Sequence, residues 1–193
     1  MLRVEFDLIG VAPLSFSAPV TSKKNTGEGH DTFEERTWRE RARGDEKGMA
    51  YIGPQALKNC MSEVAKFLGE TVPGKKGSTY TKHFEAGVLV VDPLPLGVKA
   101  AEIPGERLFV PASGKRGDGK RVWKTFPTLG KWQTHAVVYL LDPVLVDKPG
   151  KVEEYVRHAG KFIGLGRFRP RNNGYYGRFE IKNFRVIGEA VAA

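Results

Sequence analysis

Hydrophobic and charged residues alternate at the start of the chain. Every second residue from Leu2 to Leu8 is apolar, and the residues between them are charged. A period of two is typical of a β-strand with one buried and one solvated face. The chain is therefore predicted to begin with a strand.

Two later segments show the helical period, with apolar residues recurring at intervals of three and four. The first opens at Gly53-Pro54, where proline suits the first turn of a helix, and ends near Gly69. The second covers residues 152–162. Both segments are predicted to be amphipathic helices that bury one face.

The remaining apolar runs predict strands. Residues 84–91 and 135–141 are almost continuously apolar, as in strands that are buried on both faces, and a final strand is predicted over 176–187. Within residues 97–131, LFVP and RVWKTFP flank the polar turn SGKRGDGK. This arrangement predicts an inserted β-hairpin with a cationic tip.

Residues 18–48 show neither period. Seven acidic and seven basic residues lie between Thr21 and Gly48, which indicates an inserted loop, and FEERTWRERAR within it could form a short helix. Without the two insertions, the order is strand, helix, strand, strand, helix, strand. The prediction is a single α+β domain over 1–193 with a ferredoxin-like or RRM-like β-α-β-β-α-β fold, in which two helices cover one face of an antiparallel sheet.

The segment from Phe162 to Arg178 combines glycine, arginine and aromatic residues without any acidic residue. Glycine permits a positive φ and a close approach, arginine binds phosphate, and flat rings stack on unpaired bases. The segment therefore predicts single-stranded nucleic-acid binding; the alternative is a turn whose arginines only solvate the surface. The candidate residues are Gly164, Gly166, Gly174, Arg167, Arg169, Arg171, Arg178, Tyr175, Tyr176 and Phe168.

Positive charge is concentrated in two parts of the chain. Residues 113–131 hold six basic residues and one acidic residue, and residues 149–185 hold nine and three, so the two segments together carry more than the net charge of +9 of the whole chain. Localised positive charge indicates a polyanionic partner. At the hairpin, the candidate contacts are Lys115, Arg116, Lys120, Arg121 and Trp123. A membrane surface is not predicted, because neither segment has a long amphipathic helical pattern.

Several classes of chemistry lack support in the sequence. There is no phosphate-binding P-loop, nucleophile elbow or zinc ligand set, and the single cysteine, Cys60, falls on the apolar face of a predicted helix. No cofactor and no metal are predicted. The chain shows no signal-peptide pattern or membrane-spanning run, so a cytoplasmic protein is expected. His83 in TYTKHF is the one candidate for acid-base catalysis, and its alternative is a structural residue at the edge of a strand.

The element order, the basic hairpin and the ending GLGRFRPRNNGYYGRFEI resemble the RAMP superfamily of CRISPR-associated RNA-binding proteins. The resemblance covers nearly the whole chain in topology but only residues 160–181 as a motif, and a similar ending occurs in prophage-encoded proteins. It implies a glycine-rich loop between the last helix and the last strand, and a protruding thumb hairpin. Residues 23–48 match no element of the superfamily.

Taken with the residues, the resemblance predicts a non-catalytic subunit of a CRISPR-like or phage nucleoprotein assembly. It would bind single-stranded RNA or DNA, with RNA favoured, and would assemble with other CRISPR subunits or with copies of itself along the strand. Two alternatives remain open at this point. One is a metal-independent endoribonuclease centred on His83, and the other is a phage protein that imitates or blocks a CRISPR subunit.

Overall fold

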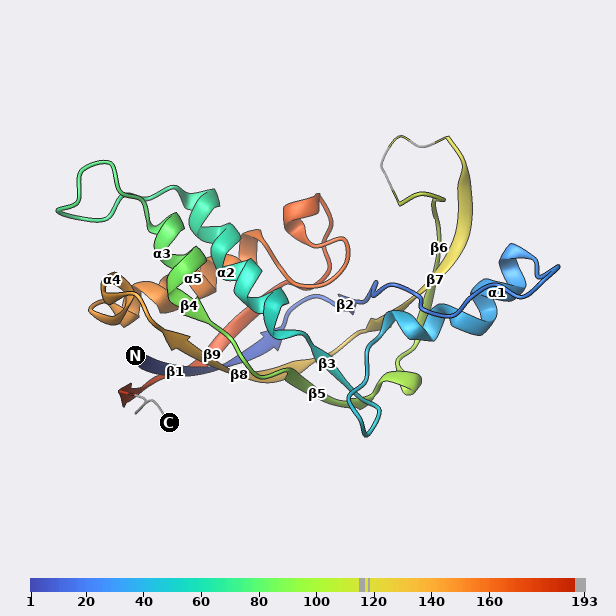
Figure 1. Cartoon of the computed structure of the whole chain (residues 1–193), viewed down its shortest axis with the longest axis horizontal. Coiled ribbons are helices and arrows are strands. Elements are labelled where there is room, and N and C mark those ends of the chain that lie inside the picture. The colour runs from blue at the N-terminus through green and yellow to red at the C-terminus, as the bar shows by residue number, and fades with distance from the viewer. Residues whose placement is uncertain (115–116, 118, 190–193) are drawn as a thin grey trace.

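The computed structural model describes residues 1–114, 117 and 119–189 (Figure 1). Its main sheet has four antiparallel strands in the order β4-β8-β1-β9. The bounds of these strands are Val88–Leu89, Gln133–Leu140, Leu2–Gly10 and Phe179–Glu189. The predicted first strand is therefore confirmed, and it lies inside the sheet between β8 and β9.

One face of this sheet is covered by α2 (Pro54–Leu68) and α5 (Pro149–Phe162) (Figure 1). The apolar residues of β1 are buried in the core with them, and the charged residues between are only partly buried. Gly160 lets α5 approach the sheet closely, because a Cβ there would lie 2.0 Å from the carbonyl oxygen of Phe179. The result is a mixed α/β fold in which two helices and an antiparallel sheet share one core.

Smaller elements surround this core. A second sheet joins β2, β7 and β6, and β3 pairs with β5. Their bounds are Leu14–Ser15 (β2), Met49–Ile52 (β3), Leu94–Lys99 (β5), Gly105–Pro111 (β6) and Arg121–Leu129 (β7). The remaining helices are α1 (His30–Thr37), α3 (Tyr80–Gly87), α4 (Pro143–Val146) and the 3-10 helices Trp38–Arg41, Ala100–Glu102 and Pro170–Asn172.

Both predicted amphipathic helices are present. The first, α2, begins at Gly53-Pro54 and ends at Gly69, which has a φ of 61°. Cys60 is fully buried, and burial raises the pKa of its thiol to about 12, so it is an unreactive core residue. Phe67 and Phe162, however, were expected on the buried faces and are 54% and 43% exposed.

The predicted strand over 84–91 is wrong for most of its length. Residues 80–87 form the helix α3, and only Val88 and Leu89 pair as a strand, β4. Tyr80, His83, Phe84 and Gly87 are buried, and their spacing of three, one and three residues marks one face of a helix. A short apolar run does not distinguish a buried strand from a buried helix, which explains the error.

The inserted hairpin is present as β6 and β7, which pair from Gly105 opposite Pro127 to Pro111 opposite Arg121. It projects from the main body (Figure 1). Lys115 and Arg116, two of the predicted contacts, lie outside the described residues. No helix in the described part of the chain combines the length and the apolar character that crossing a bilayer requires.

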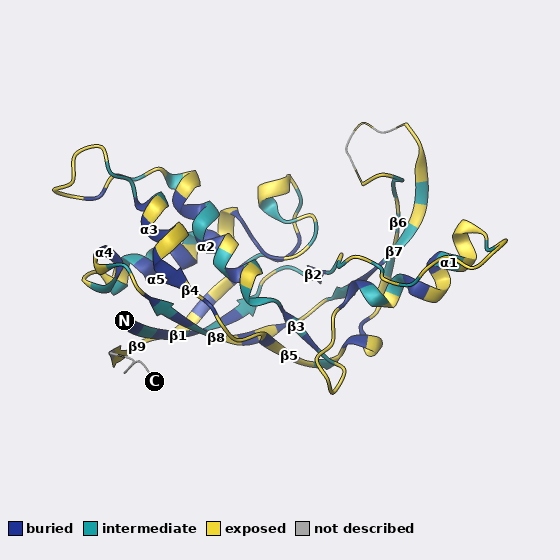
Figure 2. Ribbon diagram, viewed as in Figure 1, coloured by how far each residue is buried: buried dark blue, intermediate teal, exposed yellow. Residues whose placement is uncertain are grey.

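The insertion at 18–48 contains the short helix that the sequence allowed, α1, and it docks on the base of the hairpin (Figure 2). The buried carboxylate of Glu34 accepts two hydrogen bonds from Arg41, with N–O distances of 2.7 and 2.9 Å. Glu34 also accepts the N–H of Thr125 at 2.6 Å, and Arg41 donates to the Thr125 carbonyl at 3.0 Å. This buried ion pair therefore holds both backbone groups of one β7 residue.

Replacing Glu34 with Ala should destabilise the fold by about 3–5 kcal/mol, because it leaves the Arg41 guanidinium buried and unpaired. Urea or thermal unfolding measures this loss. Glu102→Ala is the matched control, since Glu102 makes an exposed ion pair with Lys99 whose removal should cost less than about 1 kcal/mol. Equal losses of stability for the two variants would contradict the conclusion that the buried Glu34–Arg41 pair supports the base of the hairpin.

Candidate nucleic-acid interface

The glycine-rich segment forms a loop over residues 163–178 that is hydrogen-bonded to residues 13–15, which comprise the end of the β1–β2 connection and β2 itself. The N–H of Leu165 donates to the Gly177 carbonyl at 3.0 Å, which closes the loop on itself. The N–H of Gly177 donates to the carbonyl oxygen of Pro13 at 2.7 Å, and the N–H of Arg167 donates to the carbonyl oxygen of Ser15 at 2.8 Å. The loop is therefore closed by a hydrogen bond within itself and attached to the domain by two further hydrogen bonds.

The glycines of this loop serve its own close contacts. A Cβ at Gly174 would lie 1.7 Å from the carbonyl oxygen of Phe168, and one at Gly166 would lie 2.5 Å from that of Ser15. At Gly164, where φ is 71°, a Cβ would lie 2.6 Å from Pro170. These glycines were predicted to let a bound strand approach. In the structure, the backbone that approaches them is the protein's own.

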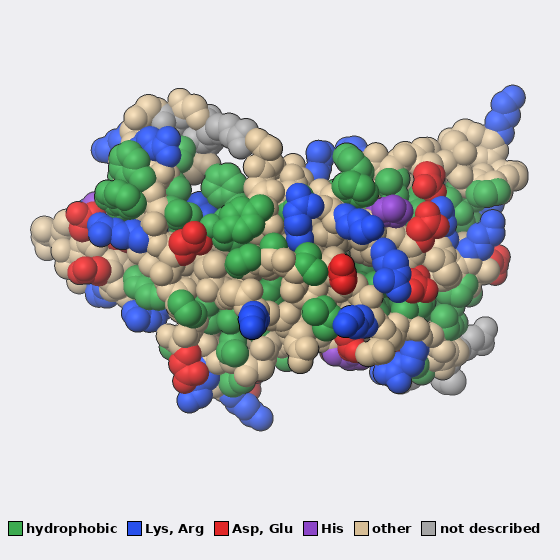
Figure 3. Space-filling model, turned by 180° about the vertical axis from the view of Figure 1, so that it is seen from behind, with side chains coloured by type: hydrophobic (Ala, Val, Ile, Leu, Met, Phe, Trp, Pro, Cys, Tyr) green, Lys and Arg blue, Asp and Glu red, His purple; other side chains and the backbone are tan. Residues whose placement is uncertain are grey.

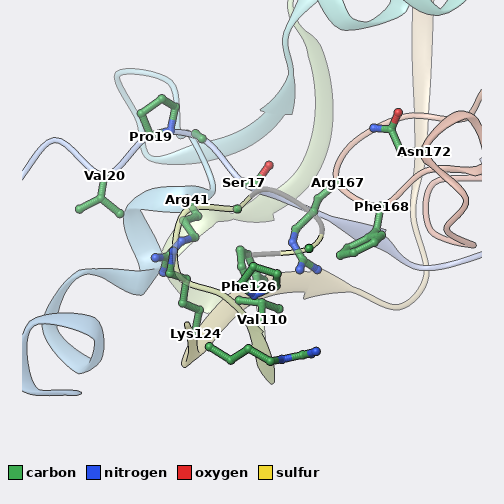
Figure 4. A pocket seen from close by; sticks show the side chains of 15 residues that line it. Ser17, Pro19, Val20, Arg41, Val110, Lys124, Phe126, Arg167, Phe168 and Asn172 are labelled. Atoms are coloured by element: carbon green, nitrogen blue, oxygen red, sulfur yellow. The ribbon is translucent and has the colours of Figure 1, made fainter. Parts of the chain in front are cut away.

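Arg167 joins the loop to the hairpin. Its guanidinium carbon lies 3.6 Å from the ring centroid of Phe126, on β7, and 4.6 Å from that of Phe168 (Figure 4). Burial lowers the pKa of Arg167, but a guanidinium stays charged at neutral pH. Its Nη1 atom is buried and has no hydrogen-bond partner among the described residues. A cation with an unused donor is thus held between two rings.

A groove passes through this position. One part, of about 950 Å³, lies between residues 17–20, the hairpin and the loop (Figure 4). A second part, of about 470 Å³, continues between the loop and the first turns of α2 as far as Asn59. The two parts share five lining residues, so we treat them as one surface, the basic groove. Its shared lining residues are Ser17, Ala18, Arg41, Arg167 and Asn172.

Among the described residues, no acidic residue lines the basic groove, whereas six basic residues do: Arg41, Arg43, Arg121, Lys124, Arg167 and Arg169. Arg41 is neutralised by Glu34, and Arg169 pairs with Glu63 at 2.7 Å. The other four have no carboxylate partner among the residues that the structure describes. The basic groove therefore carries uncompensated positive charge.

Not all the predicted arginines are free cations. Glu63 on α2 holds Arg169 and also lies 3.9 Å from Arg171, and Arg178 donates to the carbonyl oxygen of Lys161. Although the segment itself contains no acidic residue, Arg169 and Arg171 therefore do have a counter-charge. Their counter-charge comes from a distant part of the sequence. Arg167 and Arg178 have no carboxylate partner among the described residues.

The two tyrosines of the loop have different surroundings. The rings stack at 4.2 Å, with Tyr175 more than half exposed. Tyr176 is buried and donates to Glu106 on β6 at 2.7 Å, so burial and this hydrogen bond raise its pKa. Tyr175 therefore offers an open ring face, whereas Tyr176 supports it and joins the loop to the hairpin.

The outer face of the hairpin carries a second group of cations and rings. Phe109 and Trp123 are directly opposite each other on β6 and β7, with centroids 5.2 Å apart, and both are exposed. Arg107 lies over Trp123 at 5.1 Å, and Arg121 lies over Phe109 at 5.2 Å. Figure 3 shows hydrophobic side chains beside Lys and Arg side chains at the hairpin end of the molecule.

His83 differs from its expected setting. It lies on the helix α3 and is buried, with Nδ1 at 2.8 Å from an Asp142 carboxylate oxygen and Nε2 at 3.3 Å from the Ser78 hydroxyl. Neither His83 nor these partners line the basic groove. Asp142 also caps α4 by accepting the N–H of Val144. Through these contacts, His83 joins α3 to the N-terminus of α4 and to the loop before α3.

Sequence reasoning missed Arg41 and Arg43, because they lie in a segment whose charges balance. Lys124 and Phe126 lie in the predicted hairpin strand RVWKTFP, but only the structure shows that they face the glycine-rich loop. No cluster of three or more His, Cys, Asp or Glu side chains is placed to hold a metal ion within the described ranges.

Replacing Gly174 with Ala should displace the loop, because the added methyl group overlaps the Phe168 carbonyl. We expect a loss of about 1–3 kcal/mol, measured by thermal unfolding, together with faster hydrogen exchange in residues 163–178. Gly130→Ala is the control, since no atom lies within 4 Å of the added Cβ there. Unchanged exchange in the Gly174 variant would show that the loop tolerates the methyl group.

Comparison with known proteins supports the fold. A scan against protein-family models and a search of curated proteins found no match. A subunit in a cryo-EM structure of the type III-B Cmr-β complex bound to cognate target RNA matches with a TM-score of 0.58 and 13% identity, over 97% of this chain and 61% of that one. A subunit of a type IV-B CRISPR complex matches with a TM-score of 0.55 and 11% identity, over 99% and 93%. This chain therefore shares its fold with subunits of CRISPR complexes, as the RAMP resemblance implies.

Proposed function

We propose that this protein is a non-catalytic subunit of a CRISPR-like nucleoprotein assembly and that it holds a single strand, RNA in preference to DNA, in the basic groove. One observation carries the proposal: where the structure describes its lining, the groove has no acidic residue and has four basic side chains without carboxylate partners, and aromatic rings lie among them. Single strands offer phosphates and unpaired bases, which suit cations and rings respectively.

In this proposal the groove acts through charge first and stacking second. Arg43, Arg121 and Lys124 neutralise phosphates along the groove, and the charge of the Arg167 guanidinium adds to the positive potential at its centre. The exposed ring of Phe168 stacks on a base, which adds about 1–3 kcal/mol. Such binding is sequence-tolerant and weakens as salt rises.

The fold supports an assembly role. We assign the four-stranded sheet with α2 and α5 to a ferredoxin-like unit, and the β6–β7 hairpin to the thumb of the RAMP superfamily. In that assignment, the 18–48 insertion is a buttress that fixes the base of the thumb through Glu34 and Arg41. The exposed rings of Phe109 and Trp123, together with Arg107, contact a neighbouring subunit or the same strand from the outer face of the thumb. Further copies of this chain or other CRISPR subunits are the partners.

The protein is proposed to act in the cytoplasm and to cleave nothing. The buried imidazole of His83, bonded on both nitrogens, supports a structural role for this residue. A histidine that acts on RNA must reach the scissile 2′-OH, and the burial of His83 in this link argues against such contact.

Charge removal from the groove tests the binding site. Replacing Arg43, Arg121 and Lys124 together with Gln should weaken binding to labelled single-stranded RNA and flatten the slope of log K against log salt by about 0.7 per lost contact. Fluorescence anisotropy at several salt concentrations gives both quantities, and a parallel series with DNA gives the preference.

The matched control for this variant removes three charges elsewhere. Lys47, Lys99 and Lys148 are exposed and do not line the basic groove, so their joint replacement with Gln should leave the salt slope nearly unchanged. Equal slopes for the two triple variants would mean that net charge, and not the groove, drives binding.

A cleavage assay tests the absence of catalysis. The wild-type protein, incubated with single-stranded RNA in EDTA, should yield no product, and His83→Ala should bind RNA as tightly as wild type while unfolding at a lower temperature. RNA fragments that appear with the wild type and vanish with His83→Ala would establish the endoribonuclease alternative.

A further inference from the structure

A group of neighbouring aromatic rings lies on the outside of the two core helices. Phe67 on α2 and Phe162 on α5 have ring centroids 5.4 Å apart, and both are more than 40% exposed. The imidazole of His158 stacks on Phe162 at 5.8 Å with an interplanar angle of 16°. We call these three residues the aromatic platform.

Core packing does not explain the aromatic platform. Single exposed apolar residues are common, but here two helices bring their exposed rings together, beside a third. The core of α2 and α5 is formed by other residues, such as Leu57, Val64 and Val156, which are fully buried. Neighbouring rings that are partly exposed suit a planar ligand.

The aromatic platform is continuous with the basic groove. Asn59 lines the groove, and Glu63 and Phe67 follow it at intervals of four residues on one side of α2. The distance from Asn59 to Phe67 is about 12 Å along the helix axis. Arg169 lines the groove and pairs with Glu63, and Arg171 lies next to the same carboxylate. A strand leaving the groove along α2 therefore meets the platform.

The charge around the aromatic platform suits a polyanion. Lys66 and Lys161 are each the chain neighbour of a platform phenylalanine, are exposed, and have no ion-pair partner in the described part of the chain. Two carboxylates lie near the platform and each is already paired: Glu63 with Arg169, and Glu70, which interacts with His158, with Lys151. Cations beside open rings favour single-stranded nucleic acid over an apolar protein surface.

We infer that the aromatic platform is a second binding site, on which bases of the strand stack after it leaves the basic groove. This inference rests on the proposed function, because it requires the groove to hold the strand. It predicts that the protein covers more nucleotides than the groove alone accommodates.

The test compares oligonucleotides of two lengths. Fluorescein-labelled single-stranded RNA of about 6 nucleotides fills the groove alone, and RNA of about 20 nucleotides reaches both surfaces. The variant Phe67→Ala/Phe162→Ala should bind the short RNA as wild type does and the long RNA about 5- to 100-fold more weakly. 2-Aminopurine placed along the long RNA should be quenched near one end by wild type and not by this variant.

Two further variants keep the test specific. Phe67→Tyr/Phe162→Tyr retains flat rings and should bind the long RNA within about twofold of wild type. Val91→Ala/Leu141→Ala removes two other exposed apolar side chains and should also bind as wild type. Circular dichroism and thermal unfolding should show that all of these variants fold.

The outcomes separate the two proposals. Long-RNA affinity that is unchanged in the alanine variant, with the groove still binding short RNA, would overturn the platform alone. Wild-type protein that binds neither RNA would overturn the proposed function, and the platform with it. Self-association of the wild type that the alanine variant loses, without any change in RNA affinity, would overturn the inference by making the platform a protein interface.

Discussion

The proposed binding surface depends on the position of one guanidinium. Arg167 lies between a ring of the hairpin, Phe126, and a ring of its own loop, Phe168, so it joins two segments that are far apart in the sequence. Cation–π contacts of this kind contribute about 0.5–2 kcal/mol each. Because the same side chain keeps an unused donor, the contact that builds the basic groove also provides a charged group within it.

The hairpin can project only because its base is fixed. Two partly buried contacts hold it, the hydrogen bonds of the Glu34–Arg41 pair to Thr125 and the hydrogen bond from Tyr176 to Glu106. They reach the hairpin from the 18–48 insertion and from the glycine-rich loop. The insertion, of which residues 23–48 match no element of the RAMP superfamily, is thus part of the support for the proposed binding surface.

Local patterns predicted the fold well, and long-range pairing limited the prediction of the site. The first strand, the two main helices and the hairpin follow from periodicity and turn residues, whereas α3 was missed because a short apolar run fits a strand and a helix equally. The partners of the loop residues lie far away in the sequence: Glu63 is 106 residues from Arg169, and Glu106 is 70 from Tyr176. No local pattern reveals such pairs. The positive charges of Arg169 and Arg171, which the sequence places far from any acidic residue, are therefore paired in the structure.

The central claim is that a single strand lies in the basic groove between the glycine-rich loop and the hairpin. Ultraviolet cross-linking of the wild-type protein to single-stranded RNA, followed by mass spectrometry of the attached peptides, tests it directly, since aromatic residues that stack on bases cross-link most readily. The account predicts cross-links at Phe168 or Tyr175 and on the hairpin strands. Cross-links confined to the open face of the main sheet would contradict it.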